Sequence, residues 1–173
     1  SRGLGDVYKR QGDTESRQMA KIKPLRENEL FKDFSDKEIA VVSQIVSEKA
    51  YPKGTPIYVE NMLGESLFIV KSGSVEIKKN LGPGGENLVA VIGPGEMFGE
   101  MAILEGGPRL VSAKAQEETE LLMISGDDFK AFMEKEPVVC LKLFLGIIKM
   151  FTRRIRELMP LAEEFLSWKS KKK

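Results

Sequence analysis

The chain has 173 residues, a hydrophobic fraction of 42% and a formal net charge of +1, from 27 basic and 26 acidic residues. This length suits one domain with appendages, and the near-neutral charge argues against a general nucleic-acid-binding surface. The absence of histidine excludes histidine metal sites and histidine-based catalytic triads. The single Cys140 excludes an intrachain disulfide, and its apolar surroundings are typical of a buried thiol. With no apolar run of membrane-spanning length and no visible signal peptide, we expect a cytoplasmic protein without a membrane span.

The N-terminal end does not read as part of a folded domain. Residues 1–11, SRGLGDVYKRQ, show neither apolar periodicity nor a helix cap. Part of this stretch has the sequence that one reading frame of a common transposon-end sequencing adapter encodes, so we interpret residues 1–11 as a library artefact. We expect residues 12–23 to form a flexible segment and residues 24–159 to form the domain. Residues 160–173 are expected to be a short helix and a basic tail.

Two helical segments are predicted at the start of the domain. Residues 24–31, PLRENELF, predict a short helical turn, and an amphipathic helix follows over about 35–48. Ser35 with Glu38 three residues later forms a capping box at the start of that helix. Apolar residues then recur at helical spacing, at Ile39, Val42, Ile45 and Val46.

After Pro52 the pattern changes to short segments rich in β-branched and aromatic residues, each bounded by glycine, asparagine or a polar turn. The stretch LGPGGEN, residues 81–87, predicts a hairpin loop between two of them. Strands this short, at a spacing of roughly ten residues, predict a small barrel or jelly roll. The expected strands lie within residues 56–60, 66–73, 74–80, 87–93, 109–115 and 119–125.

Two helices are expected after the last strand. Ser125 and Asp128 form a capping signal for the first, and Pro137 precedes a second, apolar-striped helix that Pro160 is expected to end or kink. The stripe resembles a coiled-coil seam, with spacings of three and four. The seam consists of Leu141, Phe144, Ile148, Phe151, Ile155 and Leu158. The predicted fold is therefore mainly β with flanking helices (α+β): a double-stranded β-helix or jelly-roll barrel with an N-terminal helix and two C-terminal helices.

The stretch FGEMAILEGGPRL, residues 98–110, contains the candidate binding residues. Gly99 permits a tight bend, and residues 100–104 favour one helical turn whose first N–H groups can bind an anion. A glycine–proline turn then returns Arg109 toward the start of that helix. A guanidinium and backbone N–H groups that meet at one anion follow the logic of phosphate recognition. The alternative is a local ion pair between Glu100 and Arg109 across a surface loop.

This stretch resembles the phosphate-binding cassette of cyclic nucleotide-binding domains, the family of bacterial cAMP receptor regulators, regulatory subunits of cAMP-dependent kinase and cyclic nucleotide-gated channels. Phe98 to Ala102, a short loop and then Pro108-Arg109 stand at family spacing. The early strands are punctuated by glycine as in the family, at Gly54, Gly64 and Gly73. The resemblance covers about residues 24–158, includes the order of elements and implies a cyclic nucleotide ligand.

By this resemblance, Glu100 would hold the ribose 2′-hydroxyl and Arg109 would pair with the cyclic phosphate. The other ligand-binding residues implied around the phosphate, several of them through their N–H groups, are Gly99, Met101, Ala102, Leu110 and Val111. The base would meet residues of the early strands, either Phe68 and Val70 or Val89 and Val91. A residue of the last helix would close over the purine, with Leu141, Phe144, Leu145 and Ile148 as candidates.

One departure from the family pattern bears on the ligand. The family commonly has Ala, Ser or Thr directly after the arginine, often followed by Ala, whereas this chain has Leu110 and Val111. The missing hydroxyl disfavours cGMP relative to cAMP, and Leu110 is bulky enough to crowd the pocket. We therefore predict cAMP as the preferred ligand and cGMP as the weaker one. Without histidine, Glu100 and Arg109 do not make an acid–base pair, so we expect no enzyme, no cofactor and no metal site.

The long helix after Pro137 is the expected output of the domain. Its seam extends beyond what a small roll can cover, which predicts a homodimer, with packing inside one chain as the alternative. A helix-turn-helix does not fit within residues 160–173, so we expect a stand-alone sensor with an effector protein and no nucleic-acid partner. A fragment of a longer regulator is the other possibility for the chain. The alternative function is a non-binding domain of the same fold that acts as a dimerisation or protein-interaction module.

Overall fold

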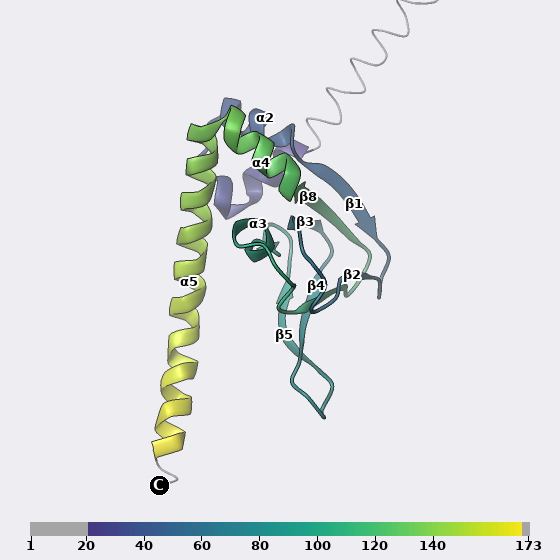
Figure 1. Ribbon diagram of the computed structural model, residues 1–173, viewed down its shortest axis with the longest axis vertical. Helices are drawn as coiled ribbons and strands as arrows, with labels where there is room; N and C mark the ends of the chain where they lie inside the picture. The colour runs from purple at the N-terminus through teal and green to yellow at the C-terminus, as the bar shows by residue number, and fades with distance from the viewer. Residues whose placement is uncertain (1–20, 171–173) are drawn as a thin grey trace, which may run out of the picture.

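The computed structural model describes residues 21–170 (Figure 1). The interpretations of residues 1–11 and 12–20, and of the last three residues of the tail, lie outside the described residues. Residues 21–23, expected to be flexible, are helical, and the helix continues to residue 27. That helix is anchored because Leu25 is fully buried in the core, with Ile22 packed beside it. The short 3₁₀ helix η1 (Glu29–Phe31) follows.

The described strands form two antiparallel sheets of four strands each, in the orders β1-β8-β3-β6 and β2-β7-β4-β5. Figure 1 shows helices grouped on one side of this roll, so the jelly roll with flanking helices is confirmed. The six predicted strands are present, although β7 begins three residues later than expected, and β1 and β6 were not predicted. Their bounds are β1 Ser47–Tyr51, β2 Pro56–Tyr58, β3 Ser66–Ser72, β4 Val75–Asn80, β5 Glu86–Ile92, β6 Met97–Phe98, β7 Ser112–Ala115 and β8 Thr119–Ser125.

Strands β3 and β8 form the centre of the fold because both of their faces are buried. In β3, Leu67 and Ile69 join an apolar cluster with the helices, whereas Phe68 and Val70 join a second cluster with the other sheet. A strand buried on both faces reads as a continuous apolar run. The sequence of β3, SLFIVKS, has that form.

Helix α2 (Asp36–Ser43) begins as predicted and ends earlier than predicted. The Ser35 side chain accepts from the N–H of Glu38, and the Glu38 carboxylate accepts from the N–H of Ser35, so the capping box is confirmed. The prediction that this helix reaches residue 48 is wrong. Residues 47–51 instead form β1, which pairs along β8 from Ser47 opposite Met123 to Tyr51 opposite Thr119. These ladder hydrogen bonds outweigh the weak local helix preference of the segment.

Helix α3 (Met101–Leu104) lies within the cassette, and two helices follow the roll: α4 (Gly126–Lys135) and α5 (Pro137–Ser170). The Ser125 cap of α4 is confirmed, because its hydroxyl accepts from the N–H of Asp128 at 3.1 Å. Of the two effects predicted for Pro160, an end or a kink of the last helix, the end is wrong, since α5 continues to Ser170. Proline removes one backbone hydrogen bond, and here the surrounding turns are exposed, so water can satisfy the freed carbonyl.

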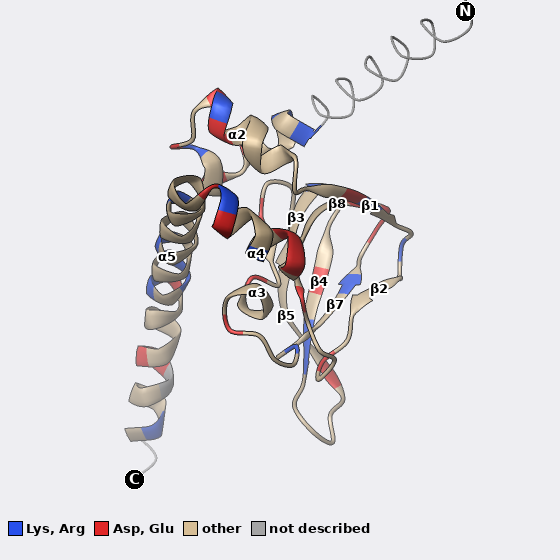
Figure 2. Cartoon of the chain, turned by 45° about the horizontal axis from the view of Figure 1, so that its top comes forward, with Lys and Arg blue, Asp and Glu red and all other residues tan. Residues whose placement is uncertain are grey.

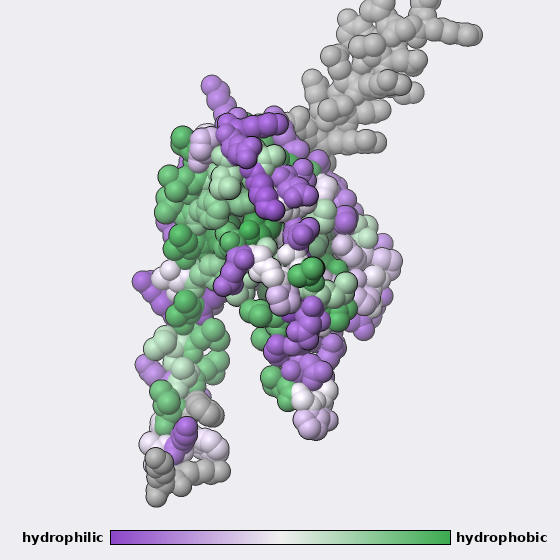
Figure 3. Space-filling model, viewed as in Figure 1, coloured by the Kyte–Doolittle hydropathy of each residue, from purple (hydrophilic) through white to green (hydrophobic). Residues whose placement is uncertain are grey.

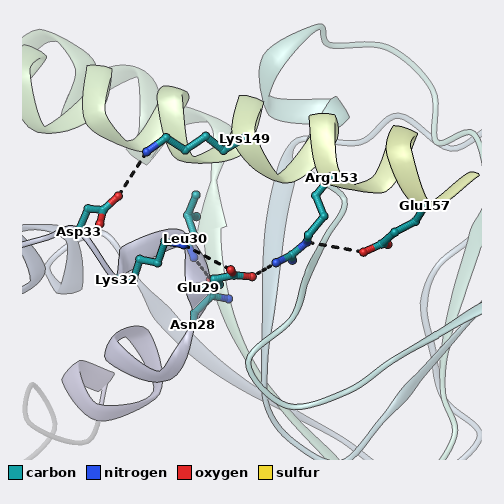
Figure 4. A network of polar contacts seen from close by, with 8 residues as sticks. All are labelled: Asn28, Glu29, Leu30, Lys32, Asp33, Lys149, Arg153 and Glu157. Atoms are coloured by element: carbon teal, nitrogen blue, oxygen red, sulfur yellow. Dashed lines mark hydrogen bonds and ion pairs between the residues drawn. The ribbon is translucent and has the colours of Figure 1, made fainter. Parts of the chain in front are cut away.

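The first half of α5 is fixed to the N-terminal helices. Cys140, Leu143 and Ile147 are buried in the helical cluster, so the buried thiol is confirmed, and burial raises the pKa of Cys140. Figure 4 shows polar contacts between α5 and the N-terminal segment: Lys149 pairs with Asp33 at 3.3 Å, and Arg153 pairs with Glu29. Figure 2 shows charges of both signs along α5, and such exposed ion pairs contribute little stability each. Apolar packing therefore supplies most of the docking energy.

The ion pair between Glu38 and Lys142 ties α2 to α5 and generates a prediction. The hydrogen bond from Lys142, followed by those from Ser35, lowers the pKa of Glu38 from 4.5 to about 2. A lowered pKa means that the stabilisation is present above pH 4.5 and is lost as the pH falls toward 2. We predict that Glu38→Gln lowers the free energy of unfolding at pH 7, and that the difference from the parent shrinks on acidification. Urea unfolding by circular dichroism at several pH values measures this.

The control for that measurement is Glu27→Gln, which removes an exposed carboxylate that pairs with Lys23 only at 3.9 Å. This variant should match the parent at every pH. A deficit for Glu38→Gln that stays constant between pH 7 and pH 2 would contradict the assignment.

Candidate functional site

A cavity of about 750 Å³ lies between β5, the α3 turn and the lower half of α5. In Figure 3 the space between that half of α5 and the β4–β5 hairpin is open. The structure brings all the residues predicted around the phosphate to this one cavity: Gly99, Glu100, Met101, Ala102, Arg109, Leu110 and Val111. Val89 and Val91 of β5 line it as well.

Arg109 is buried in the wall of this cavity, with 6% of its surface exposed. Its Nη1 donates to the Gly99 carbonyl at 3.0 Å and its Nη2 to the Ser66 carbonyl at 2.9 Å. The guanidinium carbon lies 4.1 Å from the centre of the Tyr58 ring, which is a cation–π contact. Burial lowers the pKa of Arg109, and the Glu100 carboxylate opposes that change. The site therefore holds a desolvated cation on two carbonyl dipoles and a ring.

No carboxylate pairs with Arg109 among residues 21–170, and its Nε has no hydrogen-bond partner there. The alternative prediction of a Glu100–Arg109 ion pair is therefore wrong. Glu100 is 5% exposed and accepts instead from Nη1 of Arg154, on α5, at 2.9 Å. The other terminal nitrogen of Arg154 donates to the Met97 carbonyl at 2.6 Å. The acid and the base of the cassette thus belong to two separate networks.

Two glycines allow Arg109 to take this position. Gly99 has a φ of +76°, and a Cβ built on it would lie 2.8 Å from Nη1 of Arg109. A Cβ on Gly64 would lie 2.7 Å from the guanidinium carbon. Any side chain at either position would displace the guanidinium, so both glycines are explained by close approach as well as by turn geometry.

Some backbone N–H groups of the α3 turn are already hydrogen-bonded within the turn itself. The N–H of Ala102 donates to the Gly99 carbonyl at 3.3 Å, and the N–H groups of Ile103 and Leu104 donate to the Glu100 carbonyl. The N–H of Ala102, one of those predicted to face the phosphate, is therefore already engaged inside the turn.

Of the two pairs of residues predicted to contact the base, only one lines the cavity. Val89 and Val91 line the cavity, whereas Phe68 and Val70 are buried between the sheets and do not line it. Phe68 stacks on Phe98 with ring centres 5.2 Å apart, so it supports the cassette from below. The alternation of β3 sends these two side chains to the inter-sheet cluster.

The structure does not bring the predicted lid residues to the cavity. Phe144 packs edge-on against Phe129 of α4, and the others are exposed on the outer face of α5: Leu141, Leu145 and Ile148. The residues of α5 that do line the cavity are Arg154, Glu157 and Leu158. This shift arises because the first half of α5 is docked on the helical cluster. Arg154 follows Phe151 by three residues and precedes Leu158 by four, so helical spacing of the predicted seam would have identified it.

Tyr58 is a further residue that was not singled out from the sequence. It lies in a predicted strand and lines the cavity beneath Arg109. Burial is the main cause that raises the pKa of Tyr58 to about 12, so its ring is neutral under physiological conditions.

In residues 21–170 no group of acidic and cysteine side chains has an arrangement that could hold a metal ion. No helix in the same part of the chain combines the length and apolarity needed to cross a bilayer.

Comparison with known proteins gives the same picture. A family model described as a cyclic nucleotide-binding domain matches residues 48–136. The chain belongs to this family. It is 35% identical over 133 residues to the cyclic AMP receptor protein of Thermus thermophilus, a match that covers 77% of this chain and 60% of that protein.

Solved structures support the cyclic nucleotide-binding fold. The catabolite activator protein of Thermus thermophilus has a TM-score of 0.71 at 34% identity, over 81% of this chain and 63% of that one. A cyclic nucleotide-binding domain from Methylobacillus flagellatus has a TM-score of 0.72 at 25% identity, over 81% of this chain and 79% of that one. The chain spans about 60% of the length of the curated Thermus relative.

The contact between Tyr58 and Arg109 generates a prediction that needs no ligand. In a double-mutant cycle of Tyr58→Leu and Arg109→Met, we expect a coupling free energy of about 1–2 kcal/mol, the size of a desolvated cation–π contact. Urea unfolding of the four proteins measures it. A cycle with Tyr58→Phe, which keeps the ring, should show little coupling, and additive effects in the Tyr58→Leu cycle would contradict the contact.

Proposed function

We propose that the protein is a sensor that binds a cyclic nucleotide, with cAMP preferred over cGMP, in the cavity beside α5. In this proposal Arg109 pairs with the cyclic phosphate and Glu100 accepts from the ribose 2′-hydroxyl. The observation that carries it is the buried guanidinium, which has no acidic partner among the described residues. A buried cation without a counter-charge is costly, and an anionic guest would supply the missing charge.

The rest of the cavity fits the other parts of such a ligand. Val89, Val91 and Leu158 offer apolar surface for a purine. Leu110 and Val111 follow the arginine and carry no hydroxyl, which is the chemical reason for the preference for adenine over guanine. The name of the relative from Thermus thermophilus, a cyclic AMP receptor protein, supports the same ligand.

Helix α5 is the element through which we expect binding to be signalled. Arg154 holds the carboxylate that the ribose hydroxyl would use, so the ligand must share or displace that ion pair. A ligand that changes the free energy of this contact also changes the preferred position of α5, which is the requirement for a population shift. The molecule would then act on an effector protein or through its own dimer, and we expect this to occur in the cytoplasm.

The outer face of α5 supports a homodimer. Phe144 and Phe151 of the predicted seam pack against their own helical cluster, which leaves a neighbouring stripe exposed at spacings of three, four and seven. Figure 3 displays apolar side chains along this part of α5. Such a stripe matches a coiled-coil interface between two copies. Its members are Val138, Leu141, Leu145, Ile148, Ile155 and Met159, each half exposed or more.

The same stripe favours the second candidate function, a non-binding domain that acts as a dimerisation or protein-interaction module. The two candidates share the fold and differ in whether the cavity is used. Binding of cAMP separates them directly.

The first test is the Arg109→Ala variant. Loss of one partner of a buried charge pair costs about 3–5 kcal/mol, so we expect saturable cAMP binding in isothermal titration calorimetry to disappear. The matched control is Arg156→Ala, which removes an exposed arginine of α5 and should bind cAMP like the parent. Circular dichroism checks that the variant is folded. A folded Arg109→Ala protein that binds as tightly as the parent would overturn the site.

The dimer is tested with Ile148→Glu, which puts a charge in the middle of the exposed stripe of α5. We expect the parent to sediment as a dimer at micromolar concentration and this variant as a monomer, because two buried carboxylates would face each other. Met133→Glu is the control, since Met133 is an exposed apolar residue on α4 outside the stripe. A monomeric parent, with and without cAMP, would refute the dimer.

A further inference from the structure

We propose that Glu60 and Lys79, which do not line the cavity, are positioning residues that orient the backbone after Arg109 for phosphate binding. The inference rests on the proposed function, because the property that they would set is affinity for the cyclic nucleotide. It assigns a role to a polar cluster on the far side of the cassette, which neither the predicted motif nor the cavity lining includes.

The segment that needs orientation lies between α3 and β7. Residues 105–111 form no strand, and β7 begins only at Ser112. The loop after β2 holds this segment from outside: the N–H of Arg109 donates to the Met62 carbonyl at 2.7 Å, and the N–H of Asn61 donates to the Arg109 carbonyl at 2.8 Å. The backbone of Arg109 is thus tied to the loop in both directions.

Asn61 adopts an unusual conformation to make its contact. Its φ is +67°, and it is the one residue other than glycine with a positive φ in residues 21–170. Asparagine tolerates the left-handed region better than most residues, but the conformation still carries a cost. The strained residue of the loop, Asn61, is therefore the one whose N–H binds the Arg109 carbonyl.

Lys79, supported by Glu60, holds the next peptide group, the one between Leu110 and Val111. Nζ of Lys79, on β4, donates to the Leu110 carbonyl at 2.8 Å and to Oε1 of Glu60 at 2.5 Å. The second oxygen of Glu60 accepts from the N–H of Asn80 at 3.0 Å. The N–H of Glu60 donates to the Ser112 hydroxyl, also at 3.0 Å. Glu60 therefore uses both carboxylate oxygens and its backbone to join β4, the loop and the start of β7.

These contacts determine where the N–H groups of the segment point. In a trans peptide group the carbonyl and the following N–H point in opposite directions, and the described chain has no cis peptide bond. Because Asn61 holds the Arg109 carbonyl and Lys79 holds the Leu110 carbonyl, the N–H of Leu110 points away from Asn61 and the N–H of Val111 points away from Lys79. Leu110 and Val111 line the cavity, whereas Asn61 and Lys79 do not. The positioning role requires that these two backbone donors face the cavity, at the place proposed for the phosphate.

The molecule offers a matched pair for comparison on the same strand. Lys78 and Glu76 form an ion pair at 2.6 Å, with exposed side-chain fractions of 25% and 22%, against 37% and 14% for Lys79 and Glu60. The side chains of Lys78 and Glu76 pair with each other, and neither forms a hydrogen bond or ion pair with the described segment after Arg109. Loss of a merely structural ion pair of β4 should therefore have the same effect at either position.

The test is calorimetric titration of cAMP into the full chain and its variants. We expect Lys79→Met and Glu60→Met to weaken binding by about tenfold, the effect of losing one hydrogen bond to a charged group. The controls Lys78→Met and Glu76→Met should stay close to the parent. Lys79→Arg, which can still donate to the Leu110 carbonyl, should restore most of the affinity.

Glu60→Met also separates positioning from simple electrostatics. It removes a negative charge close to the site and leaves Lys79 in place, so attraction of the phosphate alone would make binding tighter. Positioning requires the opposite, weaker binding. If Lys79→Met does not fold, as judged by circular dichroism, Glu60→Met and Lys79→Arg decide the question.

The outcomes distinguish the inference from the proposed function. If the parent binds cAMP and both methionine variants bind like their controls, or Glu60→Met binds more tightly, the positioning role is overturned and the site stands. If the parent binds no cyclic nucleotide, the proposed function fails and the positioning role fails with it. Weakened binding confined to the Glu60 and Lys79 variants supports the role.

Discussion

The desolvated guanidinium of Arg109 is the constraint on which the site depends. Two carbonyl groups and the Tyr58 ring stabilise it, and the two neighbouring glycines leave room for it. None of these partners carries a full negative charge, so a positive charge remains at the cavity wall. A buried cation without an acid is tolerated only where surrounding dipoles are fixed in advance, which is also the arrangement that recognises an anion with little reorganisation.

The ion pair between Arg154 and Glu100 connects this site to the helix that forms part of the outer surface. Arg154 of α5 holds Glu100 at the cavity, and the opposite face of the same helix exposes an apolar stripe. The upper half of α5 is docked firmly on the N-terminal helices, whereas the lower half meets the roll through few groups. A guest that competes for Glu100 would therefore act on the part of α5 that is least constrained, which gives the proposed sensor a physical route from ligand to helix.

Features set by local sequence were predictable, and features set by long-range packing were not. The cassette residues were found together because glycine spacing and a tight turn are local properties, and the strands because β-branched runs are. The helix that ends at Ser43 is predicted too long, because the residues after it pair as β1 with β8. That pairing joins segments about 70 residues apart, which local sequence does not reveal. The lid was assigned to residues 141–148, because the sequence does not reveal that docking on the N-terminal helices directs Arg154 and Leu158 to the cavity.

The most direct measurement is a crystal structure of the chain with cAMP bound. We predict density for the nucleotide in the cavity beside α5, with the cyclic phosphate about 3 Å from the Arg109 guanidinium and the ribose hydroxyl on Glu100. Nucleotide bound elsewhere, with Arg109 still directed only at the carbonyls of Gly99 and Ser66 and the cavity empty at millimolar cAMP, would contradict the account.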